Sequence, residues 1–159
     1  MDWAGWATFG FGATVALTAL MVGAQLAGLT RMDIPMMLGT MFVGDSDRAR
    51  VIGFFVHLLN GQFFALFYAA GFALLDRAAW WLGAIFGAFH GVAALTLIIP
   101  LLPGVNSRMA SERAGPELDN VLEPPGLLAL NYGRETPLVA LGAHVIFGVI
   151  LGIFLTSVP

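Results

Sequence analysis

The sequence predicts an all-α integral membrane protein: a four-transmembrane-helix bundle made of two parallel two-helix repeats, each with a short interfacial helix. The composition points to a membrane, because 58% of the 159 residues are hydrophobic and 11% are charged, against about 25% charged in soluble domains. Four stretches reach the roughly 20 apolar residues that a bilayer requires. Short motifs in one half of the chain also recur in the other half.

The four predicted spans contain no Asp, Glu, Lys or Arg, and they cover residues 5–29, 51–75, 78–102 and 138–158. They leave two long connections, 30–50 and 103–137, within a single membrane domain, 1–159. The net charge of −3 and the absence of Lys exclude a nucleic-acid binder. The absence of Cys excludes disulfides and thiolate metal sites.

The arginines predict the orientation. Only Arg77 lies in the short turn between the second and third spans. The other six lie in the two long connections: Arg31, Arg48, Arg50, Arg108, Arg113 and Arg134. Cytoplasmic connections are enriched in Arg and Lys. We therefore expect these connections to be cytoplasmic and both termini to lie on the outer face, in a bacterial inner (cytoplasmic) membrane.

Matching motifs predict an internal duplication, with repeat 1 at 1–76 and repeat 2 at 77–159. Ala-Leu-Thr occurs at 16–18 and 94–96, and an HxxxG motif begins at His57 and again at His144. Two spans per repeat preserve the topology, so the repeats are expected to be parallel and related by an axis along the membrane normal.

An interfacial helix is expected in each long connection. Asp33 and Glu123 each precede a proline, which is typical of an acidic N-cap with proline in the first turn. After Asp33, four apolar residues form a stripe expected to lie in the membrane interface: Ile34, Met37, Leu38 and Met41.

Small residues predict close helix packing. The third span has glycine at every fourth position, and the fourth span has a GxxxG pair: Gly83, Gly87 and Gly91, then Gly148 and Gly152. Such faces let helix backbones approach in lipid. Thr136 followed by Pro137 predicts the start of the fourth helix.

All three histidines lie inside predicted spans, where ionisable residues are rare and usually functional. At 1.5 Å per residue, His57 and His144 lie roughly 9 Å and His90 roughly 14 Å below the cytoplasmic boundary. We predict that these three form a cofactor-binding layer. Polar residues near it, expected to support the histidines, are Asn60, Gln25 and Thr18.

Three interpretations of this layer remain open. In the first, each histidine is structural and hydrogen-bonds to a neighbouring helix. In the second, His57 and His144 ligate a b-type haem or another tetrapyrrole, with Gly61 and Gly148 making room, or His57, His90 and His144 hold a copper or zinc ion. In the third, the histidines line a proton path or a lipid or quinone pocket.

The favoured function is a small membrane binding or accessory protein, homo-oligomeric or part of a larger membrane complex. It would bind a haem or other tetrapyrrole, a metal ion or a hydrophobic ligand at the histidine layer. A small-solute or proton transporter or channel is one alternative, and a membrane oxidoreductase subunit is another. No catalytic residue is assigned, because the sequence lacks a phosphate-binding glycine loop, GxSxG and HExxH.

Several motifs resemble a bacterial domain-of-unknown-function family of small four-helix integral membrane proteins. They are the two HxxxG helices, the segment 33–39 (DIPMMLG), Leu102-Pro103-Gly104, Asn131-Tyr132-Gly133 and Thr136-Pro137. The resemblance spans nearly the whole chain. It implies an all-helical membrane fold and recurrence of His57 and His144, and it implies no activity.

Overall fold

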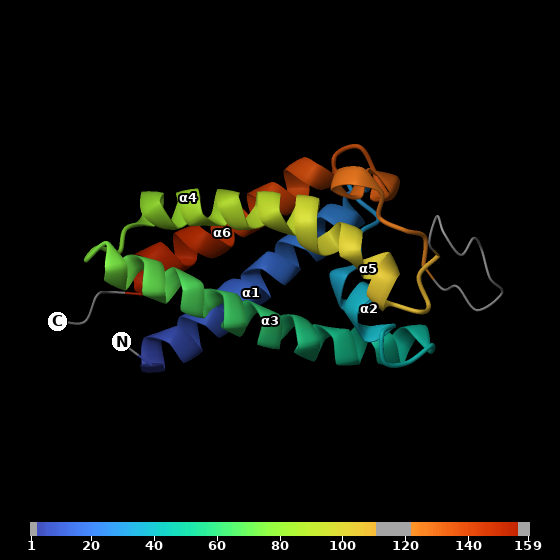
Figure 1. Ribbon diagram of the computed structural model, residues 1–159, viewed down its shortest axis with the longest axis horizontal. Helices are drawn as coiled ribbons and strands as arrows, with labels where there is room; N and C mark the ends of the chain where they lie inside the picture. Colours follow the sequence, from blue (N-terminus) through green and yellow to red (C-terminus); the bar gives the residue numbers. More distant parts are fainter. Residues whose placement is uncertain (1–2, 111–121, 156–159) are drawn as a thin grey trace. The chain divides into compact units, whose positions relative to one another are not determined.

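The computed structural model describes residues 3–110 and 122–155. The described residues are helical and contain no β-strand. Four helices are long and apolar enough to cross a membrane: α1 (Trp3–Leu26), α3 (Ser46–Leu74), the run Trp80–Val105 that begins with α4, and α6 (Thr136–Phe154) (Figure 1). The predicted all-helical fold with four long apolar helices is thereby confirmed.

The second long helix begins earlier than predicted, at Ser46 instead of Val51. The Asp45 carboxylate accepts a hydrogen bond from the backbone N–H of Arg48 at 2.9 Å and so caps the first turn. The segment 47–50 was expected in the connection before the second span, because its charged residues, Asp47, Arg48 and Arg50, cannot lie in the hydrocarbon layer. A capped helix can nevertheless continue past the apolar segment. The predicted end of the fourth span at Val158, like Arg113, lies outside the described residues.

The third span is not a uniform α-helix. It consists of α4 (Trp80–Ala93), a π-helical turn (Ala94–Ile98) and α5 (Ile99–Val105). Pro100 and Pro103 cannot donate the backbone hydrogen bonds of an α-helix. The backbone N–H of Ile99 bonds to the carbonyl of Ala94, five residues earlier, which defines the wider turn.

The two expected interfacial helices have different outcomes. At the first position a short helix is present, α2 (Ile34–Gly39), and the Asp33 carboxylate caps it by accepting from the Met36 N–H at 2.9 Å, while its place in an interface stays a prediction. The second prediction is wrong, because the segment forms a 3-10 turn, η2 (Leu127–Tyr132), whose N-cap is Gly126 and not Glu123. Leu128 and Ala129 adopt left-handed backbone angles there, with φ of 53° and 59°, which no α-helix accommodates.

The chain divides into two compact units. Unit 1 contains Met1–Leu20, Leu58–Val92 and Ala140–Pro159, and unit 2 contains Met21–His57 and Ala93–Val139. Each unit therefore draws segments from both predicted repeats. Within unit 1, Gly61 lies against Thr14, whereas Gly148 lies against Gly83. Aligning the two Ala-Leu-Thr motifs makes Val92 the counterpart of Thr14, so a duplicated fold would place Gly148 against Val92, whereas it lies against Gly83. The duplication therefore stays a prediction.

Unit 1 has an aromatic core. Phe72 of α3 stacks on Phe86 of α4, with ring centroids 5.4 Å apart, and Tyr68 contacts Phe147 of α6 at 5.3 Å. On α1, the Trp6 indole N–H donates to the backbone carbonyl of Gln62 at 3.0 Å. These contacts join α1, α3, α4 and α6 within the unit.

Unit 2 has a core of methionine and threonine. Met32 and Met37 are each 1% exposed, so Met37 is not the interface-facing residue that the apolar stripe predicted. The helices α2 and α3 meet backbone to backbone. A methyl group on Gly39 would contact the carbonyl of Ala49, and one on Gly53 would contact the carbonyl of Pro35. Met37 is therefore enclosed by the loops and helices of its own unit.

Candidate functional site

Glycines bring α4 and α6 together in unit 1. A Cβ atom on Gly83 would lie against the carbonyl oxygen of Gly148, and one on Gly148 against the carbonyl oxygen of Gly83. Closer to the histidines, a Cβ on Gly87 would lie against the carbonyl oxygen of His144. The glycine faces read from the sequence therefore pack against each other, and this contact positions His144 beside α4.

Two of the three histidines meet in this unit. The rings of His90 and His144 are 4.7 Å apart between centroids and nearly perpendicular, at 80°. The hydroxyl of Tyr68 lies 3.2 Å from Nδ1 of His90, within hydrogen-bond distance. We call Tyr68, His90 and His144 the histidine–tyrosine cluster. It joins α3, α4 and α6 through polar aromatic side chains.

Phenylalanine rings surround the cluster. The ring of Phe64 lies 4.2 Å from that of His90, and the ring of Phe147 lies 6.0 Å from it. Tyr68 is 4% exposed and Phe147 is 1% exposed. The polar atoms of the cluster are therefore held in an apolar environment, where hydrogen bonds are electrostatically stronger than in water.

The backbone of α6 sets the proton position on His144. Its Nδ1 lies 2.7 Å from the carbonyl oxygen of Ala140, one turn earlier. A carbonyl oxygen can only accept, so Nδ1 carries the proton. In the neutral ring the lone pair is then on Nε2, which is the usual arrangement of a histidine that binds a metal or accepts a hydrogen bond from a ligand.

Among the described residues of unit 1, Thr18 and Asn60 form no hydrogen bond with the cluster. His57 belongs to unit 2, so its pairing with His144 stays a prediction. Thr18 donates to the carbonyl of Thr14 on its own helix, and Gln25 donates to the carbonyl of Met32. Asn60 is exposed on α3.

The geometry narrows the candidate cofactors. Within the described residues, no three His, Asp or Glu side chains form a group able to hold a metal ion. A tetrapyrrole between His90 and His144 does not fit, because two metal–nitrogen bonds of about 2 Å each would separate the ring centres by about 6 Å. The observed 4.7 Å leaves no room for it.

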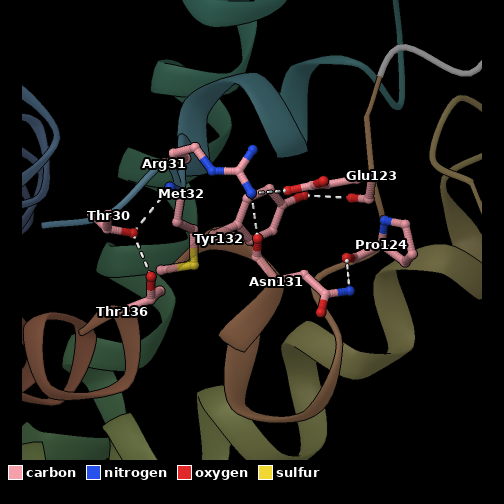
Figure 2. Close-up of polar contacts among 8 residues, drawn as sticks. All are labelled: Thr30, Arg31, Met32, Glu123, Pro124, Asn131, Tyr132 and Thr136. Atoms are coloured by element: carbon pink, nitrogen blue, oxygen red, sulfur yellow. Dashed lines mark hydrogen bonds and ion pairs between the residues drawn. The ribbon is translucent and has the colours of Figure 1, made fainter. Parts of the chain in front are cut away.

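A second polar cluster, in unit 2, was not anticipated as a unit from the sequence. Figure 2 shows the Arg31 guanidinium between the carboxylate of Glu123, at 2.7 Å, and the carbonyl of Asn131, at 2.5 Å. The Tyr132 hydroxyl donates to the carbonyl of Glu123 at 2.6 Å. The hydroxyls of Thr30 and Thr136 are 2.7 Å apart. These bonds tie the loop after α1 to the segment 123–132 and to the first residue of α6.

Burial raises the pKa of the Tyr132 hydroxyl to about 12; the negative charge of Glu123 adds to the rise and Arg31 opposes it. Between about pH 10 and 12 the folded protein thus keeps a proton that the unfolded chain has released. We expect stability from this group to be complete below about pH 10 and to fall as the pH rises toward 12.

The measurement is a pH titration of unfolding in detergent, with tyrosinate absorbance recorded in parallel. A Tyr68→Phe background leaves Tyr132 as the only tyrosine, since the chain has two. Tyr132→Phe is the control and should flatten the pH dependence in this range. Ionisation of Tyr132 near pH 10 with the protein still folded would contradict the expected burial.

Asn106, which follows α5, is a further buried polar residue that sequence reasoning missed. It is 1% exposed, and its Nδ2 donates to the carbonyl of Met37 at 3.0 Å and to the hydroxyl of Thr40 at 2.9 Å. Its Oδ1 accepts from the backbone N–H of Arg108. In the sequence, Asn106 closely follows Leu102-Pro103-Gly104, one of the motifs that resemble the membrane protein family. That position is the one sequence signal that points to Asn106.

No protein-family model, no curated protein and no solved structure matches this chain. The resemblance to a family of small four-helix membrane proteins accordingly stays a prediction, and functional inference depends on the geometry above.

Proposed function

We propose that the chain is a multi-pass membrane protein of the binding or accessory type. Four long apolar helices support membrane insertion. So do large apolar side chains exposed on each of them, including Phe11, Leu59, Phe89 and Ile153, which are 51%, 70%, 73% and 51% exposed. Contact between so much apolar surface and water is unfavourable, whereas lipid tails solvate such a surface. The arginine distribution supports cytoplasmic long connections.

The histidine–tyrosine cluster is its binding centre, and the ligand is a hydrophobic molecule whose head donates a hydrogen bond or offers a metal centre to imidazole. The single observation that carries this proposal is the contact of His90 with His144, beside Tyr68, among phenylalanine rings. The lone pair on Nε2 of His144 can bind an electron-pair acceptor. The metal of a tetrapyrrole and the hydroxyl of a quinol-type head are both acceptors of that kind.

A purely structural role explains less. The bond between the Tyr68 hydroxyl and Nδ1 of His90 would by itself suffice to join α3 to α4. A second imidazole in contact with the first is not needed for packing, because an apolar ring would fill the same position without a polar nitrogen. The second ring nitrogen of His144, Nε2, is the atom that favours a bound ligand.

The test is ligand content and ligand-induced stabilisation of protein purified in mild detergent. Absorption spectra and mass spectrometry of organic extracts would identify a co-purifying molecule, and haemin and decylubiquinol serve as added probes. A probe at about 100 times its Kd should stabilise the protein by about 2.7 kcal/mol. We expect His144→Phe, which keeps a ring in place, to lose this stabilisation.

Thr18→Ala is the matched control, because Thr18 is buried in the same unit but bonds only within its own helix. It should keep the ligand and the probe response. A colourless, ligand-free preparation that neither probe stabilises, or an unchanged response in His144→Phe, would leave the cluster with a structural role only.

A further inference from the structure

One intramembrane polar residue is left without a partner by the fold. Asn60 lies on the exposed side of α3, and its amide makes no hydrogen bond with any described residue. It is also at the middle of the helix, 14 residues from Ser46 (60 minus 46) and 14 from Leu74 (74 minus 60). If α3 crosses the membrane as proposed above, with its apolar segment beginning at Val51, the amide lies nine residues (60 minus 51), or roughly 14 Å, into a hydrocarbon layer about 30 Å thick.

The surface around Asn60 is apolar and aromatic. Asn60, Phe63 and Phe67 are spaced i, i+3 and i+7, so they share one face of the helix. Phe63 and Phe67 are 56% and 59% exposed, and the neighbouring Leu59 is 70% exposed. The rings of Phe63 and Phe67 contact each other at 5.1 Å between centroids. We call these four residues the Asn60 face.

A lone amide on such a face is costly in lipid. The side chain of Asn offers two N–H donors and a carbonyl acceptor, and lipid tails offer it no partner. Apolar residues elsewhere on the face gain nothing from association in lipid, which solvates them equally well. The amide is therefore the group that favours contact with another helix.

We propose that the Asn60 face is a docking surface for a second copy of this chain, with the two Asn60 amides hydrogen-bonded to each other across a twofold axis. An amide is self-complementary, because each copy supplies the donor that the other needs and accepts in return. A twofold contact also presents the same face on both copies. This inference rests on the proposed membrane insertion and is independent of any ligand.

Cysteine cross-linking of the full chain in native membranes tests the contact directly, since the protein has no cysteine of its own. Phe63→Cys places a thiol on the Asn60 face. Phe89→Cys is the matched control, because Phe89 is 73% exposed and belongs to a different helix, α4. Mild oxidation should convert Phe63→Cys into a disulfide-linked homodimer and leave Phe89→Cys monomeric.

Asn60→Leu, added to Phe63→Cys, should lower the dimer yield about 3- to 15-fold at equal protein-to-lipid ratio, the range expected for one interhelical polar contact. Asn60→Gln, which keeps the amide, should retain most of the yield and shows that the position tolerates substitution.

Several outcomes would overturn the docking surface. These are equal cross-linking at positions 63 and 89, a dimer yield unaffected by Asn60→Leu, or an adduct heavier than a homodimer, which would assign the face to a different protein. Alkaline carbonate extraction separates this failure from failure of the membrane proposal. Protein released by carbonate would refute insertion itself, whereas retained protein without a homodimer refutes only the contact.

Discussion

Gly148→Ala is expected to destabilise the folded protein by about 1–2 kcal/mol net, although alanine is the better helix former. The added methyl group would lie against the carbonyl oxygen of Gly83, a backbone atom that cannot rotate away. The two helices must therefore separate, and overpacking of this kind costs about 1–3 kcal/mol or more. Helix propensity returns only about 0.5–1 kcal/mol.

Gly142→Ala supplies a control on the same helix. A Cβ atom at Gly142 meets nothing within 4 Å, so this variant gains helix propensity without a clash. We expect it to be neutral or slightly stabilised. Unfolding followed by circular dichroism in detergent, with increasing denaturant, gives both values. Equal stabilities for the two variants would show that α4 and α6 do not touch through Gly83 and Gly148.

Gly148→Ala is also expected to affect the histidine–tyrosine cluster. Gly87 lies against the backbone of His144, and Gly91 lies against its Cβ. Separation of α4 from α6 would therefore also separate His90 from His144. We expect Gly148→Ala to weaken any ligand response of the cluster together with stability, whereas His144→Phe should remove the ligand response with a smaller loss of stability.

Asn106→Leu is expected to cost about 2–4 kcal/mol in unit 2. The substitution removes the donors and the acceptor of the amide, so the Met37 carbonyl loses one of its two side-chain hydrogen bonds and the part-buried N–H of Arg108 loses its acceptor. Each buried polar group left unsatisfied costs about 1–3 kcal/mol. The hydroxyl of Thr40 still donates to the Met37 carbonyl at 3.1 Å, which limits the loss.

Asn131→Leu is the comparison, because the exposed Asn131 amide makes one bond, to the carbonyl of Pro124. Water can replace that bond, so its loss should stay below about 1 kcal/mol. Hydrogen exchange of the α2 backbone, with overall unfolding, measures both effects. If Asn106→Leu left α2 as protected as in the wild type, Asn106 would not be the residue that holds the connection in place.

Local sequence signals predicted the helices and most of their ends. Apolar run length identified the four long helices, and the capping side chain of Asp33 marked the start of α2. The rule failed at Glu123 because an acidic residue before proline caps a helix only if the next residues adopt helical angles. Here the carboxylate of Glu123 pairs with Arg31, about 90 residues away in sequence, and residues 124–126 are not helical.

By itself, the sequence determined where the four long helices lie, which segments are apolar enough for a membrane and which glycines face another helix, because each depends on residues within a few turns. Only the tertiary structure decided which polar side chains meet. His90 joined His144 because Gly87 and Gly91 allow α6 to approach, whereas Asn60 was left on the exposed face of α3. Depth along a helix can be counted from the sequence, but the direction in which a side chain points toward its neighbours depends on how the helices pack.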